Sequence, residues 1–258
     1  STKQDKLEKQ YDKGETSVII SKSEKLKRQE IILEGVAADI VASTIEIEEV
    51  DPGVLFVSLH TPSDGKSTSE ILNQLMEKYD SDDNMKHIII GIDANTKNSK
   101  LIKSTMTTVT NLGLKVCYFN DSSSTEAMIN GRPEKDNFKE LPVTRNTTGS
   151  SRTFLQSQYY KALEKDGSYV DFILYHSKDG NDILVPDSSH KLINKINNEF
   201  TRGKVSGDLD KLLNNRNPSD HKPRSASFKI TFENKKRELV SRIFNVMSHN
   251  MAGPNGSM

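Results

Sequence analysis

The sequence Asn-Pro-Ser-Asp-His-Lys-Pro at residues 217–223 is followed closely by three alternating apolar residues, Phe228, Ile230 and Phe232. Alternation with a period of two predicts a strand with one buried face. The two prolines restrict the backbone on either side of an acid next to an imidazole, Asp220 and His221. A pair of this kind at the start of a strand is typical of reactive groups at the rim of a sheet, although a solvated loop can have the same composition.

The overall composition describes a polar, folded chain. Charged residues make up 28% and hydrophobic residues 33% of the 258 residues, and 36 Lys and Arg balance 36 Asp and Glu. This balance gives no global electrostatic argument for nucleic acid or an anionic membrane as the partner, although a local basic groove is compatible with it. No apolar window is long enough to span a bilayer, and residues 1–6 lack the apolar core of a signal peptide. The compartment is unknown, with a soluble intracellular protein favoured.

Cys117 is the single cysteine, which excludes an internal disulfide framework and a Cys-rich zinc site. It lies within the apolar run 114–119, so we expect a buried hydrophobic residue there and not a nucleophile.

Hydrophobic periodicity predicts a layered α/β domain. A strand, a helix and a strand follow one another at 54–59, 69–79 and 87–92, which is the order of a βαβ unit. A helix at 100–112 and strands at 114–119 and 169–175 come next. Further strands are predicted at 17–20, 30–33, 39–41 and 183–185, and a further helix at 189–200.

Residues 120–152 form a long irregular insertion rich in Ser, Thr, Asn and Gly. Loops of this length are often functional, so this segment is a candidate for substrate recognition, with a surface loop as the alternative. Its basic residues are Arg132, Lys135, Lys139 and Arg145, and glycosylation sequons occur at Asn120, Asn146 and Asn255.

Polar side chains follow or begin several predicted strands. His60 follows the strand 54–59, Asp93 and Asn95 follow the strand 87–92, and Asp171 lies inside the apolar run 169–175. Strand ends at one edge of an α/β sheet converge on a shared cleft. Carboxylate and amide oxygens suit Mg²⁺, and histidines beside them suit acid–base work on a phosphate ester. Each group alone also has an ordinary structural explanation, such as a turn former or a structural ion pair.

Four ordered segments together carry a resemblance to a known family. They are Ser58-Leu59-His60, Gly91-Ile92-Asp93-Ala94-Asn95, Asp171-Phe172-Ile173-Leu174 and Ser219-Asp220-His221 with Pro223. In this order they resemble the endonuclease/exonuclease/phosphatase superfamily, the DNase I-like fold, over roughly residues 15–232. The resemblance implies a four-layered α/β sandwich with two mixed β-sheets. It also implies Mg²⁺-dependent cleavage of phosphoesters, with Mn²⁺ as a possible substitute.

The resemblance also implies roles for individual residues. Asp93 would orient or deprotonate the attacking water and Asn95 would hold the scissile phosphate. His221 would contact the phosphate and be positioned by Asp171, and His60 would act as a second acid or phosphate contact. The remaining expected site residues are Asp220 near the metal and Arg152 in substrate binding, the latter being also a candidate ion-pair partner of Asp171. Nucleic acid, an inositol phosphate or a phospholipid headgroup would all be substrates in keeping with the family.

The two ends of the chain depart from the family pattern. Family members begin with a strand carrying an Asn and then a segment carrying a metal-binding Glu, and here only Glu15 is an early candidate for that glutamate. Residues 242–253 resemble the family's first strand, with Asn250 in the asparagine position. Three alternatives follow: a fragment of a tandem-domain protein, a circular permutation, or an amphipathic helix formed by Leu239, Ile243 and Met247.

These observations divide the chain into a charged segment at 1–14, a family-like domain at 15–233 and a tail at 234–258. The N-terminal portion of the domain is then missing or permuted. The leading hypothesis is a Mg²⁺-dependent phosphodiesterase or phosphomonoesterase of nuclease or phosphatase type. A catalytically impaired relative that serves as a binding or scaffolding module is the alternative, because the metal-binding Glu has no clear occupant. A nucleic-acid-binding module without chemistry is disfavoured by the zero net charge.

Overall fold

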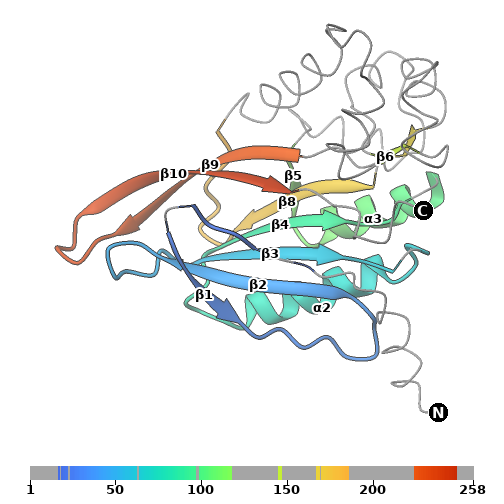
Figure 1. Cartoon of the computed structure of the whole chain (residues 1–258), viewed down its shortest axis with the longest axis horizontal. Coiled ribbons are helices and arrows are strands. Elements are labelled where there is room, and N and C mark those ends of the chain that lie inside the picture. The colour runs from blue at the N-terminus through green and yellow to red at the C-terminus, as the bar shows by residue number, and fades with distance from the viewer. Residues whose placement is uncertain are drawn as a thin grey trace, which may run out of the picture.

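The computed structural model of the chain describes residues 17, 19–22, 24–62, 64–96, 99–117, 145–146, 167–168, 170–185 and 224–248. Within these residues a six-stranded mixed sheet carries helices on one face and a two-stranded sheet on the other (Figure 1). This arrangement confirms the predicted α/β class. The two-stranded sheet within the described residues is antiparallel. A four-layered sandwich with a second mixed sheet would therefore need elements from outside the described residues.

The six-stranded sheet has the order β1-β2-β3-β4-β8-β5. Only β3 and β4 are parallel, and the other neighbours are antiparallel. The strands are β1 Lys25–Gln29, β2 Asp39–Glu46, β3 Val54–His60, β4 His87–Asp93, β5 Lys115–Val116 and β8 Asp171–Ser177. A separate pair joins β6 Arg145–Asn146 to β7 Gly167–Ser168.

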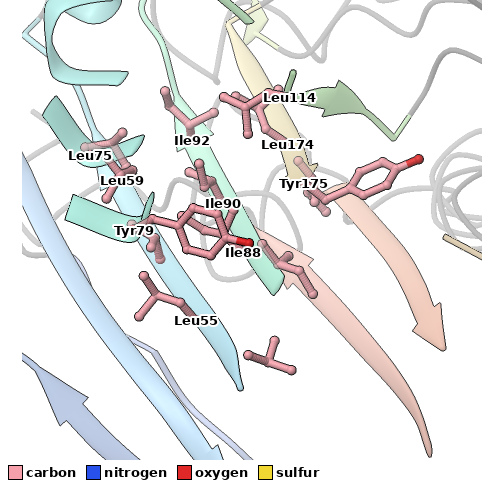
Figure 2. Packing of buried hydrophobic residues seen from close by; sticks show 14 of the residues in the cluster. Leu55, Leu59, Leu75, Tyr79, Ile88, Ile90, Ile92, Leu114, Leu174 and Tyr175 are labelled. Atoms are coloured by element: carbon pink, nitrogen blue, oxygen red, sulfur yellow. The ribbon is translucent and has the colours of Figure 1, made fainter. Parts of the chain in front are cut away.

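Helix α2, Thr68–Asp80, connects the parallel strands β3 and β4 and forms the expected βαβ unit. Its apolar face buries Ile71, Leu72, Leu75, Met76 and Tyr79. Leu75 and Tyr79 lie against Leu59 and Ile90 of the sheet, and the run of buried β-branched residues in β4 fits a central strand covered on both faces (Figure 2). Helix α3, Ser99–Asn111, lies beside α2 and leads into β5.

Strands β9, Arg224–Glu233, and β10, Leu239–Ser248, form an antiparallel hairpin over the other face of the sheet. Edge-to-face ring contacts fix this packing: Phe244 contacts Phe56 of β3 at a centroid distance of 6.2 Å, and Phe228 contacts Tyr175 of β8 at 5.5 Å. The predicted strand after residue 223 is therefore confirmed, with Phe228, Ile230 and Phe232 on the buried side.

Two short strands predicted near the N-terminus are wrong. Residues 30–33 are irregular, and residues 19 and 20 are not in a strand. Ile20 and Ile32 are exposed, whereas Ile31 and Leu33 are partly buried against the core without forming a strand. The strand that does form is the polar β1, which is held by pairing with β2 and by the ion pair between Lys25 and Glu46 at 3.2 Å.

The helix considered for residues 239–247 is also wrong, because this segment is β10. Apolar residues spaced by four fit either one helix face or one strand face. Here the hydrogen-bonded partner β9 and the buried residues between them decide for the strand. The helix at 189–200 and the insertion at 120–152, apart from β6, lie outside the described residues. None of the helices in the described ranges has the length and apolar content needed to cross a membrane.

Candidate functional site

Four ionisable residues form a row across the sheet. Asp39 of β2 is paired with His60 of β3, His60 with Asp93 of β4, and Asp93 with Asp171 of β8. Residues directly opposite each other on neighbouring strands face the same side of a sheet. This side is the one that β9 and β10 cover, since Phe56 lies four residues before His60 on the same face and contacts Phe244. The strand registers thus bring together side chains that lie far apart in the sequence.

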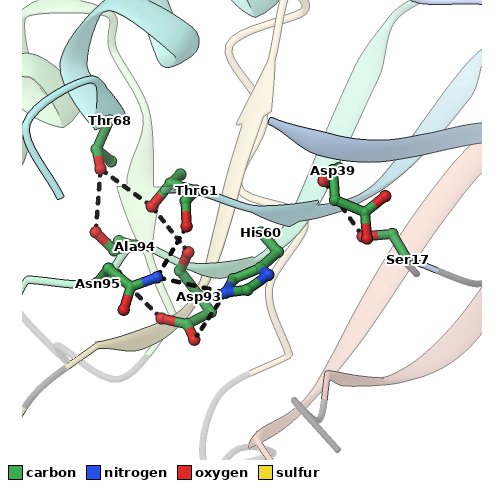
Figure 3. Close-up of polar contacts among 8 residues, drawn as sticks. All are labelled: Ser17, Asp39, His60, Thr61, Thr68, Asp93, Ala94 and Asn95. Atoms are coloured by element: carbon green, nitrogen blue, oxygen red, sulfur yellow. Dashed lines mark hydrogen bonds and ion pairs between the residues drawn. The ribbon is translucent and has the colours of Figure 1, made fainter. Parts of the chain in front are cut away.

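Asp93, Asn95 and His60 make direct contacts (Figure 3). The Nε2 atom of His60 lies 3.6 Å from Oδ2 of Asp93 and 3.3 Å from Nδ2 of Asn95. The backbone N–H of Asn95 donates to Oδ1 of Asp93 at 3.0 Å. An imidazole between a carboxylate and an amide can donate to the first when protonated and accept from the second when neutral. The trio therefore has the groups that proton transfer requires.

Asn95 is held in the left-handed region, with φ at 47°. Asparagine tolerates this conformation better than most residues, and here it turns the backbone N–H back towards the Asp93 carboxylate. The Asn95 Nδ2 group also donates to the Thr61 carbonyl at 2.8 Å. Gly65 lies so close that a Cβ there would be 2.5 Å from the Asn95 carbonyl oxygen. The side-chain amide of Asn95 is therefore fixed in direction.

Two buried threonines connect the site to the start of α2. The Thr61 N–H donates to the Asp93 carbonyl at 3.0 Å, and its hydroxyl donates to the same oxygen at 3.1 Å. The Thr68 hydroxyl donates to the Ala94 carbonyl at 3.0 Å and lies 3.2 Å from the Thr61 hydroxyl. Both threonines have no exposed surface. The ends of β3 and β4 and the first turn of α2 are thereby joined into one rigid unit.

The first and last residues of the hairpin lie near the end of the sheet that carries His60 and Asp93. Ser248, the last residue of β10, lies against Gly91 of β4, two residues before Asp93. Arg224, the first residue of β9, pairs with Ser248. Residues 220 and 221 precede Arg224 by four and three positions, so the described part of β9 starts within about 14 Å of chain length from them.

The structure brings together four of the predicted site residues, His60, Asp93, Asn95 and Asp171. The other predicted site residues, Glu15, Arg152, Asp220, His221 and Asn250, lie outside the described residues. The pairing of Asp171 with His221 therefore stays a prediction.

Asp39, Thr61 and Thr68 belong to this end of the sheet and were not singled out from the sequence. Figure 3 shows Asp39 beside Ser17, whose hydroxyl donates to the Asp39 carbonyl at 3.2 Å. Asp39 begins a strand, and a sequence pattern does not reveal which residue of another strand it will face. Thr61 directly follows His60, and Thr68 directly precedes the predicted helix 69–79, so these neighbouring positions were the signal available in the sequence.

No family model and no curated protein matches this sequence. The solved structures that resemble the chain distantly include humanised TDP2 of D. rerio carrying 14 mutations, and D. rerio TDP2 complexed with a single-strand DNA product. The first has 12% identity, covers 64% of this chain and 56% of its own, and gives a TM-score of 0.37. The second has 13% identity, covers 64% and 58%, and gives 0.36. The chain thus spans less than two thirds of either structure.

Proposed function

We propose that this chain is a phosphoester hydrolase of the endonuclease/exonuclease/phosphatase type. The proposal rests on one observation above all: His60, Asp93 and Asp171, from three separate sequence motifs, occupy a single row at one end of the sheet, and Asn95 contacts the first two. Turn formers and structural acids scattered along a chain have no reason to meet in this way.

The contacts suit the attack of water on a phosphate. Asp93 is 6% exposed and receives the Asn95 N–H, so its carboxylate is held in one orientation from which it would accept a proton from the attacking water. Nδ2 of Asn95 would donate to a non-bridging phosphate oxygen in place of its contact with His60. His60, partly exposed beside both, would then bind the phosphate or protonate the leaving oxygen.

Asp171 has a different part in the proposal. It is 5% exposed and is paired directly with Asp93, so two buried carboxylates share one register position on the same face. Like charges placed opposite each other are destabilising, and a cationic group between or beside them would offset this cost. His221 is the proposed group, because Asp171 would orient its imidazole and favour the protonated form.

The family resemblance implies Mg²⁺, and the described residues alone do not fit it. Within them, no group of three or more His, Cys, Asp or Glu side chains lies close enough to hold a metal ion. A metal site would need Asp220 together with Glu15, Asn250 or another group from outside the described residues.

The experiment is hydrolysis of a generic chromogenic phosphodiester and a phosphomonoester by the full chain, with Mg²⁺, with Mn²⁺ and with EDTA. Asp93→Asn is expected to reduce kcat by about 100- to 10,000-fold, as for loss of a general base. His221→Ala is expected to reduce turnover by a similar factor while the far-UV circular dichroism spectrum is unchanged. Asp179→Asn, an exposed acid just beyond the opposite end of β8, is the matched control and should leave the rate unchanged.

Two results would refute the proposal. One is activity that Asp93→Asn does not reduce. The other is activity that EDTA leaves intact, which would remove the metal dependence that the resemblance implies.

A second candidate function is a binding or scaffolding module with the same fold and no turnover. The absence of a three-ligand group among the described residues favours it. Calorimetric titration with Mg²⁺ separates the two candidates, since a tight site with one ion per chain counts against the module and no detectable binding counts for it.

A further inference from the structure

The outward face of β10 is apolar and exposed. Leu239, Ile243 and Met247 are 78%, 61% and 61% exposed, although the alternate residues of the same strand pack towards the six-stranded sheet. Only Ser241 and Asn245 separate them on this face. β10 contains a single charged residue, Arg242, and that residue is bound to Glu48 at 2.9 Å. The face therefore lacks the charges that usually protect an exposed strand from pairing.

The two edges of the hairpin differ. The outer edge of β9 is engaged by residues 183–185: the Val185 N–H donates to the Ser227 carbonyl, and the Lys229 N–H donates to the Ile183 carbonyl. The outer edge of β10 has no strand partner within the part of the chain that the structure describes. Every second residue of this ten-residue strand directs its N–H and C=O towards that edge. Such an edge is a template for another strand.

The sequence of β10 is complementary to itself in one antiparallel register. When two copies pair around a two-fold axis at Ile243, Leu239 of each copy lies opposite Met247 of the other, and the two Ile243 residues face each other. All three exposed apolar residues are then matched with apolar residues, and Ser241 lies opposite Asn245. Shifting the axis by two residues in either direction leaves one of the three unmatched. Shifting it by one residue keeps the two faces separate but places Ile243 opposite Ser241 or Asn245, so that none of the three is matched.

We propose that two copies of this chain associate through the open edge of β10 and form a continuous four-stranded sheet in the order β9-β10-β10-β9. A two-fold axis makes the contact self-limiting, because each edge is used once. One strand pair is a small interface, so we expect a dimer that dissociates on dilution, with a dissociation constant of roughly micromolar size.

Disulfide trapping tests the register directly. In Ile243→Cys the two thiols would meet at the axis, where paired Cα atoms lie about 4.5–5.5 Å apart, within the range of a disulfide. Ser241→Cys and Asn245→Cys should not cross-link in the same register when each is alone, and should cross-link when mixed. The native Cys117 is 1% exposed and gives no background. Thr231→Cys, on the same outward face but on β9, is the matched control and should stay monomeric on a non-reducing gel.

Sedimentation of the unmodified chain over a concentration series gives the second test. Ile243→Lys places two like charges across the axis and is expected to raise the dissociation constant at least about tenfold, whereas Thr231→Lys should leave it unchanged. A monomer at every concentration overturns the proposal, and so does a dimer that Ile243→Lys does not weaken. Open-ended assemblies, or cross-linking of Ser241→Cys with itself, would overturn the two-fold register.

Discussion

Gly91 offers a sharp test of how the hairpin packs on the sheet. This glycine lies in the middle of the site-bearing strand β4 and faces the hairpin, where Ser248 occupies the space that a side chain would fill. A Cβ at position 91 would be 2.6 Å from the Ser248 Oγ and 2.8 Å from its Cβ. The φ angle of Gly91 is not positive, so alanine meets no backbone strain there. Only the contact with Ser248 opposes the substitution Gly91→Ala.

The expected cost follows from these distances. Rotation of the serine side chain removes the Oγ contact, but the Cβ contact stays unless the end of β10 moves. Forcing a methyl group into a packed site costs about 1–3 kcal/mol, and the upper half of this range applies because the Ser248 Cβ cannot rotate away. Replacing glycine by alanine within a strand returns about 0.5–1 kcal/mol, so about 1–2 kcal/mol of destabilisation remains. That loss reduces the ratio of folded to unfolded protein roughly 5- to 30-fold.

Urea unfolding of a double-mutant cycle measures the effect. Ser248→Gly removes both clashing atoms, so the Gly91→Ala/Ser248→Gly pair should regain about 1–2 kcal/mol relative to the sum of the single changes. Ser248→Ala keeps the Cβ and should rescue much less. Additive single effects, or equal rescue by Ser248→Ala and Ser248→Gly, would refute the close contact between the end of β10 and β4.

Three further predictions concern groups away from the site. Burial lowers the pKa of His87 below 6.5, so the unfolded chain binds a proton at this histidine more readily than the folded protein does. The free energy of unfolding should therefore fall as the pH drops below about 6.5. His87→Gln should reduce the difference between the free energies of unfolding measured in urea at pH 7.5 and at pH 5.5. Burial raises the pKa of the Cys117 thiol well above its usual range, so the native protein should not react with a thiol reagent at pH 8, whereas urea-unfolded protein should react fully. The Lys178 ammonium donates to the carbonyls of Tyr79, Asp80 and Asp82 at the end of α2, so Lys178→Met should cost about 1–2 kcal/mol in thermal or urea unfolding.

The sequence predicted the parts of the fold in which periodicity and burial agree. The apolar strand 87–92 and the helix 69–79 were placed within one or two residues, because a central strand and an amphipathic helix each carry a signal along their own length. β1 was missed because pairing with β2, and not its own composition, makes it a strand.

The candidate site was predictable as a set of residue types and not as a geometry. His60, Asp93 and Asn95 were found from their positions after strands, and their contact was an inference from the convergence of strand ends. The pairing of Asp39 with His60 arises from the antiparallel register of β2 and β3, which depends on the whole ladder. The role of Gly91 was equally hidden, since it reflects a neighbour more than 150 residues away in the chain.

The points where the chain leaves and re-enters the sheet have a consequence for how this scaffold can diversify. The Cys117 N–H donates to the Ile173 carbonyl, and the Val170 carbonyl accepts from the Ala94 N–H, so both ends of the segment 118–169 are anchored on neighbouring strands. The entropy of closing a loop between fixed ends grows only with the logarithm of its length. Insertions, deletions or an entire replacement between these anchors should therefore leave Asp171 in register with Asp93. The ladder that holds Asp171 opposite Asp93 therefore does not depend on the length of the segment between these anchors.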